Sequence, residues 1–244
     1  MQVKQYFRFF IIRLFGYLYL NKKSKVIFYH DLHDKKKYTS MSTSIRLFRK
    51  HIDVILSNGY EIVPKITKKY GQIEICFDDG FLGLYENISI LREYNIYIHL
   101  FIISSYLNKK NYINKRQLIE LNKLPFIKIS SHTHTHRLLN TLNDLEMKKE
   151  LSKSKEILEA ILDTKITAVC YPEGVFNQKI IETAFLLGYE KQYSSIPGFY
   201  CIKSSKNVIN RSLVQFSELK EFKAILKGGD HLLYYWYKFK HYKK

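Results

Sequence analysis

The stretch IEICFDDGF, residues 73–81, places two adjacent carboxylates directly after a run of apolar residues. Such a run is typical of a buried strand, and neighbouring carboxylates at its end raise each other's pKa and resist desolvation. Two negative charges in that position are costly unless a positive group lies beside them. We therefore expect the rest of the chain to supply or to bind a positive group next to Asp78 and Asp79.

Strand-like runs recur along the chain and alternate with helical patterns. Besides residues 73–79, apolar runs rich in Ile, Val, Phe and Tyr occupy residues 25–30, 96–103, 125–131, 166–172 and 206–214. Helical spacing or helix-capping residues mark residues 43–59, 143–162 and 177–189. This alternation predicts either a doubly wound sheet or a (β/α) barrel. In both folds, functional residues gather at the carboxyl ends of the strands.

The composition bounds the class of protein. The chain has 244 residues, and its 46% apolar and 15% aromatic content excludes general disorder. The net charge of +18 favours anionic partners such as phosphates or acidic lipids, although a basic, solubilising surface is an equal alternative. Because no nucleic-acid-binding module is recognisable, we expect no nucleic-acid partner. The three cysteines are too few for a disulfide framework, which fits a reducing compartment.

Both ends of the chain are basic and aromatic. We expect a domain over residues 25–228, preceded by residues 1–24 and followed by residues 229–244. Arg8 and Arg13 interrupt the N-terminal apolar run, which suits a helix in a membrane interface better than a spanning helix. No secretory cleavage site is evident, so we expect a cytoplasmic protein, peripheral at an anionic inner membrane. The alternative is that both ends pack on the domain as ordinary terminal helices.

Three histidines follow the strand-like run 125–131. In KISSHTHTHR, His132 and His136 are four residues apart and would share one side of a helical turn. Two imidazoles and one carboxylate from another strand end form a common site for a divalent metal. A bound metal would supply the positive charge that Asp78 and Asp79 require.

These segments resemble the polysaccharide deacetylases with a NodB homology domain, carbohydrate esterase family four. Residues 77–80 match the family's F-D-D-G, and residues 132–136 match its H-[ST]-x-x-H. The resemblance extends with gaps over roughly residues 25–225. It implies a distorted (β/α) barrel and a metal-dependent hydrolase that removes an N-acetyl group from a sugar of a polysaccharide or lipid-linked glycan.

The resemblance also implies roles for individual residues. Asp78 corresponds to the general base, and Asp79, His132 and His136 correspond to the metal ligands. The metal implied is Zn²⁺, with Co²⁺ or Ni²⁺ as alternatives. His134 is not a ligand in the family pattern, so we expect it to support the site or to face solvent.

The third family motif differs from its usual form, R-P-P-Y-G. Residues 170–174 read Cys-Tyr-Pro-Glu-Gly, which is closer to a Y-P-x-G branch of the family. Cys170 stands where the arginine that braces the base would be, and Arg211 is a candidate replacement. We expect Tyr171 and Glu173 to contact substrate, with the Glu173 N–H as the oxyanion donor.

The general acid is expected near the N-terminus. The family commonly places a Leu-x-His motif near its C-terminus, but His231 and His241 follow no strand-like run. KVIFYHD, residues 25–31, does have that form, as in circularly permuted relatives. We expect His30 to protonate the leaving amine with an acidic neighbour to orient it; the alternative is that His30 only packs or caps.

Two other functions stay open at this point. A deformylase acting on a lipid-linked amino sugar would use the same residues on a different acyl group. A carbohydrate-binding pseudoenzyme would retain the fold without the chemistry, and the missing motif arginine is the argument for it.

Overall fold

The computed structural model describes residues 10–16, 21–200 and 208–242. Its main sheet has nine strands, and all of their pairings are parallel. The strands are β1 (Lys25–Tyr29), β4 (Glu61–Ile62), β5 (Gln72–Phe77), β6 (Ile98–Ile102), β7 (Ile127–Ser131), β8 (Ala168–Cys170), β9 (Lys191–Tyr193), β10 (Val208–Ile209) and β11 (Ser212–Leu213). A separate parallel pair joins β2 (Asp31–His33) to β3 (Ser42–Ser44).

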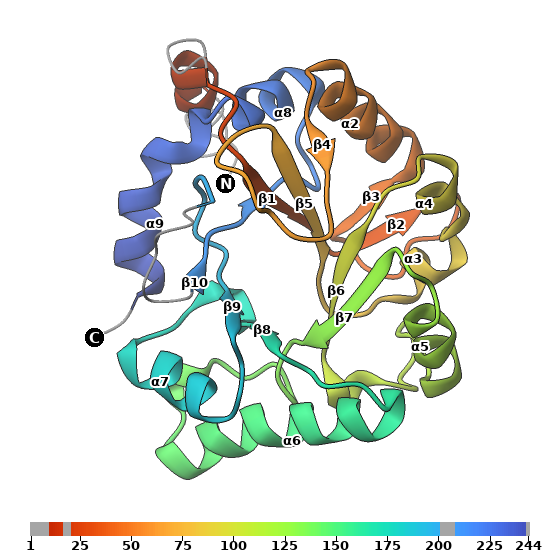
Figure 1. Ribbon diagram of the computed structural model, residues 1–244, viewed down its shortest axis with the longest axis vertical. Coiled ribbons are helices and arrows are strands. Elements are labelled where there is room, and N and C mark those ends of the chain that lie inside the picture. The colour runs from red at the N-terminus through yellow and green to blue at the C-terminus, as the bar shows by residue number, and fades with distance from the viewer. Residues whose placement is uncertain (1–9, 17–20, 201–207, 243–244) are drawn as a thin grey trace.

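Helices surround the sheet on its outer side (Figure 1). They comprise residues 10–16, α2 (Ile45–Ser57), α3 (Leu82–Glu86), α4 (Ser89–Glu93), α5 (Lys115–Asn122), α6 (Asp144–Leu162), α7 (Gln178–Leu186), α8 (Leu219–Leu226) and α9 (Leu233–His241). The helix-capping residues expected at the start of α6 form a capping box, in which the side chains of Asn143 and Glu146 each accept from the other's backbone N–H.

The order of the strands requires the sheet to curl. It runs β10-β9-β8-β7-β6-β5-β1-β11, with β4 paired to β5. The two end strands, β10 and β11, are separated in the chain by only Asn210 and Arg211. The sheet must therefore bend until its edges approach, and the expected distorted (β/α) barrel is confirmed (Figure 1). The strand expected over residues 206–214 is divided between these two edges.

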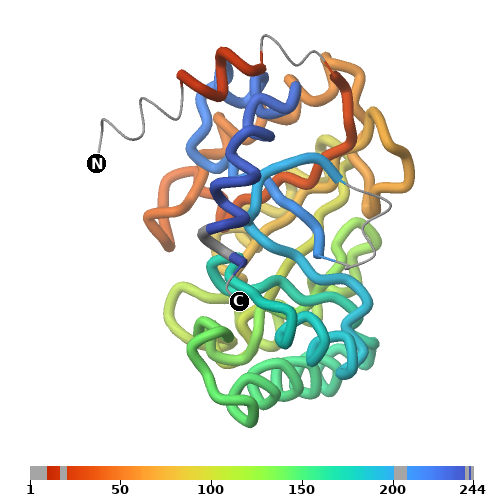
Figure 2. The backbone as a smooth tube through the Cα atoms, turned by 90° about the vertical axis from the view of Figure 1, so that its left-hand side faces the viewer, coloured from red at the N-terminus to blue at the C-terminus, as the bar shows by residue number. Residues whose placement is uncertain are grey.

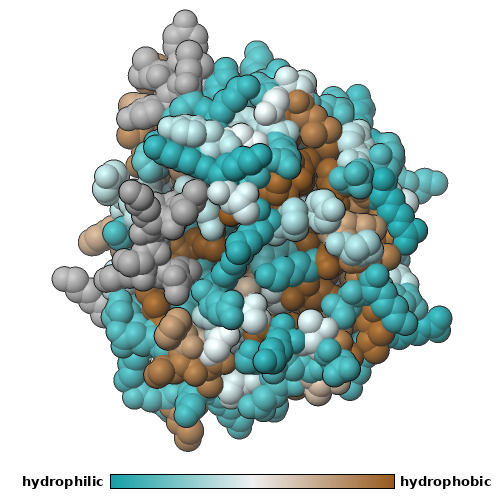
Figure 3. Space-filling model, in the orientation of Figure 1, coloured by the Kyte–Doolittle hydropathy of each residue, from teal (hydrophilic) through white to brown (hydrophobic). Residues whose placement is uncertain are grey.

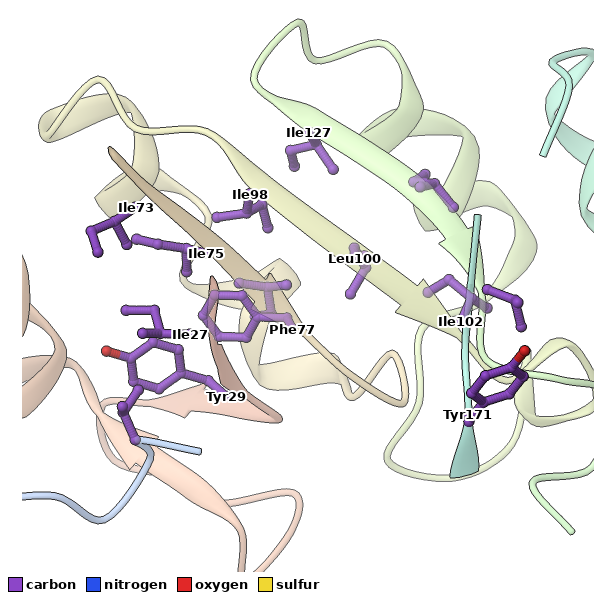
Figure 4. Close-up of a cluster of buried hydrophobic side chains, with 14 of the residues drawn as sticks. Ile27, Tyr29, Ile73, Ile75, Phe77, Ile98, Leu100, Ile102, Ile127 and Tyr171 are labelled. Atoms are coloured by element: carbon purple, nitrogen blue, oxygen red, sulfur yellow. The ribbon is translucent and has the colours of Figure 1, made fainter. Parts of the chain in front are cut away.

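Alternation along the strands separates two apolar clusters. Ile73, Ile75 and Phe77 of β5 point outwards and pack against the helices with their neighbours on adjacent strands (Figure 4). The intervening β5 residue Cys76 belongs to a smaller cluster with Phe28, Phe101, Cys170 and Tyr193, among others, inside the barrel. A residue that follows the carboxyl end of a strand and continues its inward-facing alternation therefore lies at the mouth of the barrel.

The described part of the N-terminal segment packs on the domain. Ile12 is buried in the main core, and Gly16 lies so close to Ala224 of α8 that a Cβ there would meet it at 2.6 Å. Of the membrane-interface helix expected over residues 1–24, residues 10–16 form this packed helix, and residues 1–9 and 17–20 lie outside the described residues. Within the described ranges, no helix is long and apolar enough to cross a membrane. Hydrophilic residues cover most of the face seen in Figure 3.

Candidate active site

The aspartate pair lies at the carboxyl end of β5, as the sequence predicts. Asp78 continues the inward-facing set of β5 and is 2% exposed, whereas Asp79 begins a tight turn. Asp79 has a left-handed backbone conformation, with φ of 72°, and Gly80 follows with φ of 81°. A left-handed residue other than glycine costs about 1 kcal/mol or more, and such strain concentrates at functional sites.

Arg211 is the positive partner of Asp78. Its Nη1 and Nη2 donate to the two Asp78 carboxylate oxygens at 2.7 and 2.8 Å, and both side chains are buried. The guanidinium also donates through Nε to the Ser194 carbonyl at 2.9 Å and lies over the ring of Phe28. A bidentate pair of this kind fixes the orientation of the carboxylate. Arg211 thus occupies the bracing position for which the sequence made it a candidate.

The charge of Asp78 is set by this pair. Burial alone would raise the pKa of its carboxyl, but the adjacent Arg211 outweighs burial and lowers the pKa to about 2. Asp78 is therefore a carboxylate at neutral pH. Cys170 is the residue that the resemblance aligns with the family arginine, and its Sγ lies 2.8 Å from Arg211 Nη2. A small residue at this position leaves room for the guanidinium, which enters from the β10–β11 connection.

Asp79, His132 and His136 bring three ligand atoms together. Asp79 Oδ1 lies 3.4 Å from His132 Nε2 and 3.7 Å from His136 Nε2. The Asp79 oxygen is buried and has no hydrogen-bond partner among the described residues. His132 Nδ1 donates to the Cys170 carbonyl at 2.8 Å, which leaves Nε2 unprotonated in the neutral ring. Burial lowers the pKa of His132 to about 3, so the ring is neutral at pH 7.

This donor set fits a divalent metal. Ligand atoms around a tetrahedral zinc ion, with bonds of about 2.0–2.1 Å, lie about 3.4 Å apart. The distances from Asp79 Oδ1 to His132 Nε2 and His136 Nε2 match that spacing. A buried carboxylate oxygen without a partner is otherwise costly.

Two other groups of potential ligands are less suitable. Glu74, Cys76 and His99 lie together inside the barrel, but Glu74 is already paired with His99 at 3.2 Å. The second group consists of Asp78, His132 and Cys170. A cation there would face the Arg211 guanidinium, which already occupies Asp78 and Cys170.

The histidine segment is not a helical turn, contrary to our expectation. Residues 132–136 form an irregular loop in which Thr133 and His136 have left-handed φ values of 64° and 63°. These two left-handed residues, rather than helical periodicity, bring the ring centroids of His132 and His136 to a distance of 4.7 Å. His134 Nδ1 bonds Ser104 Oγ at 2.9 Å, which fits the expectation that His134 is not a ligand.

His30 is partly exposed beside the aspartate pair. It directly follows β1, whose Tyr29 pairs with Phe77 of β5, so His30 lies at the same strand-end edge as Asp78 and Asp79. Its orienting partner is not an acid: His30 Nδ1 bonds the Oε1 of buried Gln215 at 2.6 Å. No pattern in the sequence indicated Gln215, because an uncharged amide after a short strand matches no motif.

The acidic neighbour of His30 in the chain has a different role. Asp31 Oδ1 accepts the Leu84 backbone N–H at 2.8 Å, at the start of α3. Burial raises the pKa of Asp31 to about 7. Asp31 thus ties β2 to α3, while Gln215 holds His30.

Tyr171 and Glu173 lie in the loop after β8. The Tyr171 ring points outwards into the main core, and its hydroxyl donates to Gln192 Oε1 at 2.5 Å (Figure 4). Its side chain is therefore not available to substrate, because inward Cys170 precedes it and strand alternation turns Tyr171 the other way. Glu173 is exposed, with a left-handed φ of 53°, and the role of its N–H stays a prediction.

A curled parallel sheet that carries an aspartate pair and two converging histidines at its strand ends agrees with what the resemblance to the NodB-type deacetylases implies. A family model described as polysaccharide deacetylase matches residues 65–191, so the chain belongs to the polysaccharide deacetylase family. This range includes Asp78, Asp79 and both candidate histidine ligands. His30 and Arg211 lie outside it.

Similarity to known proteins extends further along the chain. The Bacillus subtilis protein named "Putative polysaccharide deacetylase YxkH" is 26% identical over 187 residues, which cover 72% of this chain. The alignment spans 66% of that relative, slightly less than two thirds of its length.

Solved structures share the fold. IcaB from Ammonifex degensii has a TM-score of 0.74 at 17% identity, covering 84% of this chain and 97% of that chain. The Streptococcus pyogenes deacetylase PplD, solved in complex with acetate, has a TM-score of 0.72 at 18% identity, covering 83% and 96%. At these identities the likeness establishes the barrel-like fold.

The pairing of Arg211 with Asp78 can be tested through stability. We expect Arg211→Met to lower the free energy of unfolding by about 3–5 kcal/mol, because it leaves a buried carboxylate without its partner. The double variant Arg211→Met, Asp78→Asn removes that charge and should be more stable than Arg211→Met alone, as measured by urea denaturation. Equal stability of the single and double variants would contradict a buried, charged pair.

Proposed function

We propose that this protein is a metal-dependent hydrolase that removes an N-acetyl group from a sugar of a polysaccharide or lipid-linked glycan. The observation that carries the proposal is the convergence of Asp79 Oδ1 with the Nε2 atoms of His132 and His136, beside a carboxylate held by Arg211. Family membership supplies the reaction class. The ligand set suits Zn²⁺ best, and Co²⁺ or Ni²⁺ could replace it.

Asp79, His132 and His136 would hold the metal. When bound, it supplies a Lewis acid for the acyl oxygen and lowers the pKa of water towards about 7. Asp78 is ionised and hydrogen-bonded to Arg211, so it is suited to accept the proton of the attacking water. The bidentate contact with Arg211 prevents Asp78 from rotating towards the metal ligands and keeps the two carboxylates in separate roles.

His30 is suited to deliver a proton to the leaving amine. Its contact with Gln215 fixes Nδ1, so Nε2 is the atom left to exchange a proton with substrate. The backbone N–H of Glu173 is proposed to stabilise the developing oxyanion, since strained turns often direct a backbone donor into a site.

The pseudoenzyme alternative loses its main support. It rested on the missing arginine of the third motif, and Arg211 makes the expected contacts with Asp78 from another strand end. The choice between acetyl and formyl substrates, and between a polysaccharide and a lipid-linked sugar, remains part of the proposal. Action at the cytoplasmic face of the membrane is also part of the proposal.

The proposal is tested by product release. The full chain, loaded with one equivalent of Zn²⁺, is incubated with N-acetylglucosamine oligosaccharides and with their N-formyl counterparts. We expect acetate from the first set, measured by proton NMR, at a rate at least about 100-fold above that of the metal-loaded Asp78→Asn variant. Formate release alone would favour the deformylase. No product from either set, with bound oligosaccharide detected by calorimetry, would favour the binding function.

A further inference from the structure

Helix α9 exposes a continuous apolar stripe. Tyr235, Trp236 and Phe239 are 74%, 59% and 86% exposed, and Leu232 at the preceding turn is also exposed. Their spacing of three and four residues places them on one side of the helix. The opposite side packs on the domain through Leu233, Tyr234 and Tyr237. Most of the surface of these side chains is therefore exposed rather than packed in the core, and an exposed apolar patch of this kind indicates an interaction site.

A second exposed apolar pair lies on the same side of the molecule. Phe10, which is 64% exposed, and Leu14 are four residues apart on helix 10–16. This helix contacts α8 through Gly16 and the α8–α9 connection through Ile12. Figure 2 shows helix 10–16, α8 and α9 together on the side that faces its viewer. We call α9 with helix 10–16 the terminal-helix surface.

The charge of these helices is positive. Helix 10–16 and residues 219–242 contain two acidic residues, Glu221 and Asp230, and each is only 2% exposed. The exposed charged side chains described in the same ranges are all basic, namely Arg13, Lys220, Lys223 and Lys238. The nearest exposed carboxylate in the chain is that of Glu218, the N-cap residue of α8. Aromatic residues beside lysine and arginine, with few exposed carboxylates, match the interface of an anionic membrane.

We propose that the terminal-helix surface docks the protein on an anionic lipid bilayer. The rings of Tyr235, Trp236 and Phe239 would enter the headgroup region while lysine and arginine pair with lipid phosphates. A second copy of this chain is a poorer occupant, because each copy would bring the same positive charge to the contact.

The docked surface connects to the candidate site. At the end of α9, the backbone of Tyr242 forms an isolated β-bridge with Phe176, and the centroids of their rings are 5.5 Å apart. Phe176 lies three residues after Glu173 in the loop that follows β8. If the proposed function holds, docking would bring this loop close to lipid-linked substrates; the docking itself does not depend on catalysis.

The only tryptophan of the chain is Trp236, so its fluorescence reports directly on the stripe. The full chain is titrated with vesicles of phosphatidylcholine containing phosphatidylglycerol, and with phosphatidylcholine vesicles alone. We expect a blue shift of the emission and co-sedimentation with the anionic vesicles only. The variant Tyr235→Ser, Phe239→Ser keeps Trp236 and should bind at least about ten-fold more weakly, because two large apolar side chains no longer insert.

The matched control is Leu56→Ser, Ile119→Ser. These exposed residues belong to α2 and α5, on the other side of the barrel from α9 (Figure 1), so the control should bind as the unmodified chain does. The proposal is overturned by absent binding, by equal weakening in both variants, or by co-sedimentation without a Trp236 shift. A shift that depends on protein concentration without vesicles, with a dimer by analytical ultracentrifugation, would instead identify a protein interface.

Discussion

His132→Ala is expected to lose both the bound metal and the activity. The substitution removes one of three protein ligands, whereas loss of a group that merely orients a ligand already costs about 10–100-fold in metal affinity. We therefore expect a decrease of at least about 100-fold in zinc affinity. Elemental analysis of protein purified without a histidine tag should find about one zinc-like ion per unmodified chain and none in the variant.

His134→Ala is the control that the chain itself offers. His134 lies in the same loop but bonds Ser104 rather than approaching Asp79, so its loss should leave the metal content unchanged. Chelation should abolish the activity of the unmodified protein, and Zn²⁺, Co²⁺ or Ni²⁺ should restore it. Activity that survives complete metal removal, or equal metal loss in the two histidine variants, would contradict the assigned ligands.

The parts of the site that follow one strand could be predicted from the sequence. Asp78 and Asp79 are adjacent to an unmistakable apolar run, and parallel strands place such residues at one edge of the sheet. His132 follows the strand that ends at Ser131 and was found by the same argument. Its approach to His136 was predicted for the wrong reason, because the loop turns at two left-handed residues that no helical spacing could indicate.

Contacts across the barrel could not be predicted in the same way. Arg211 was the candidate because it lies near the end of a strand-like run, and only the curl of the sheet decides in its favour. β11 pairs with β1 at Ile27↔Ser212, and β1 pairs with β5 at Ile27↔Ile75, so only β1 separates β11 from β5. The long side chain of Arg211, the residue before β11, then reaches Asp78 at the end of β5. Register and curl depend on the whole sheet, so no local pattern encodes them.

One residue was given the wrong role and another was missed. Tyr171 was expected to contact substrate because its family motif does, but alternation after inward-facing Cys170 directs its ring into the outer core. Gln215 shows the opposite case, since no local rule distinguishes an amide that holds His30 from any other polar loop residue. The sequence thus predicted which strand ends carry chemistry better than which side chains orient it.

The second large effect is expected from Asp78→Asn. This change removes the proposed base without removing a metal ligand, so it should lower kcat by about 10²–10⁴-fold while the metal content stays near that of the unmodified protein. The neighbouring change Asp79→Asn should instead lower the metal content, because Asp79 Oδ1 is the atom that His132 and His136 face. A measurement of metal content would thereby distinguish the roles of the two adjacent carboxylates.

The stability of Asp78→Asn must be measured beside its rate. The substitution leaves Arg211 buried without its partner, so a lower unfolding midpoint in urea is expected. Arg211→Met, Asp78→Asn removes both charges and should recover stability without recovering activity. Because the introduced amide cannot accept a proton in either variant, lost activity in the more stable double variant assigns the effect to chemistry. Recovery of activity together with stability would show that Asp78 acts through the fold, and the base would then have to be sought elsewhere.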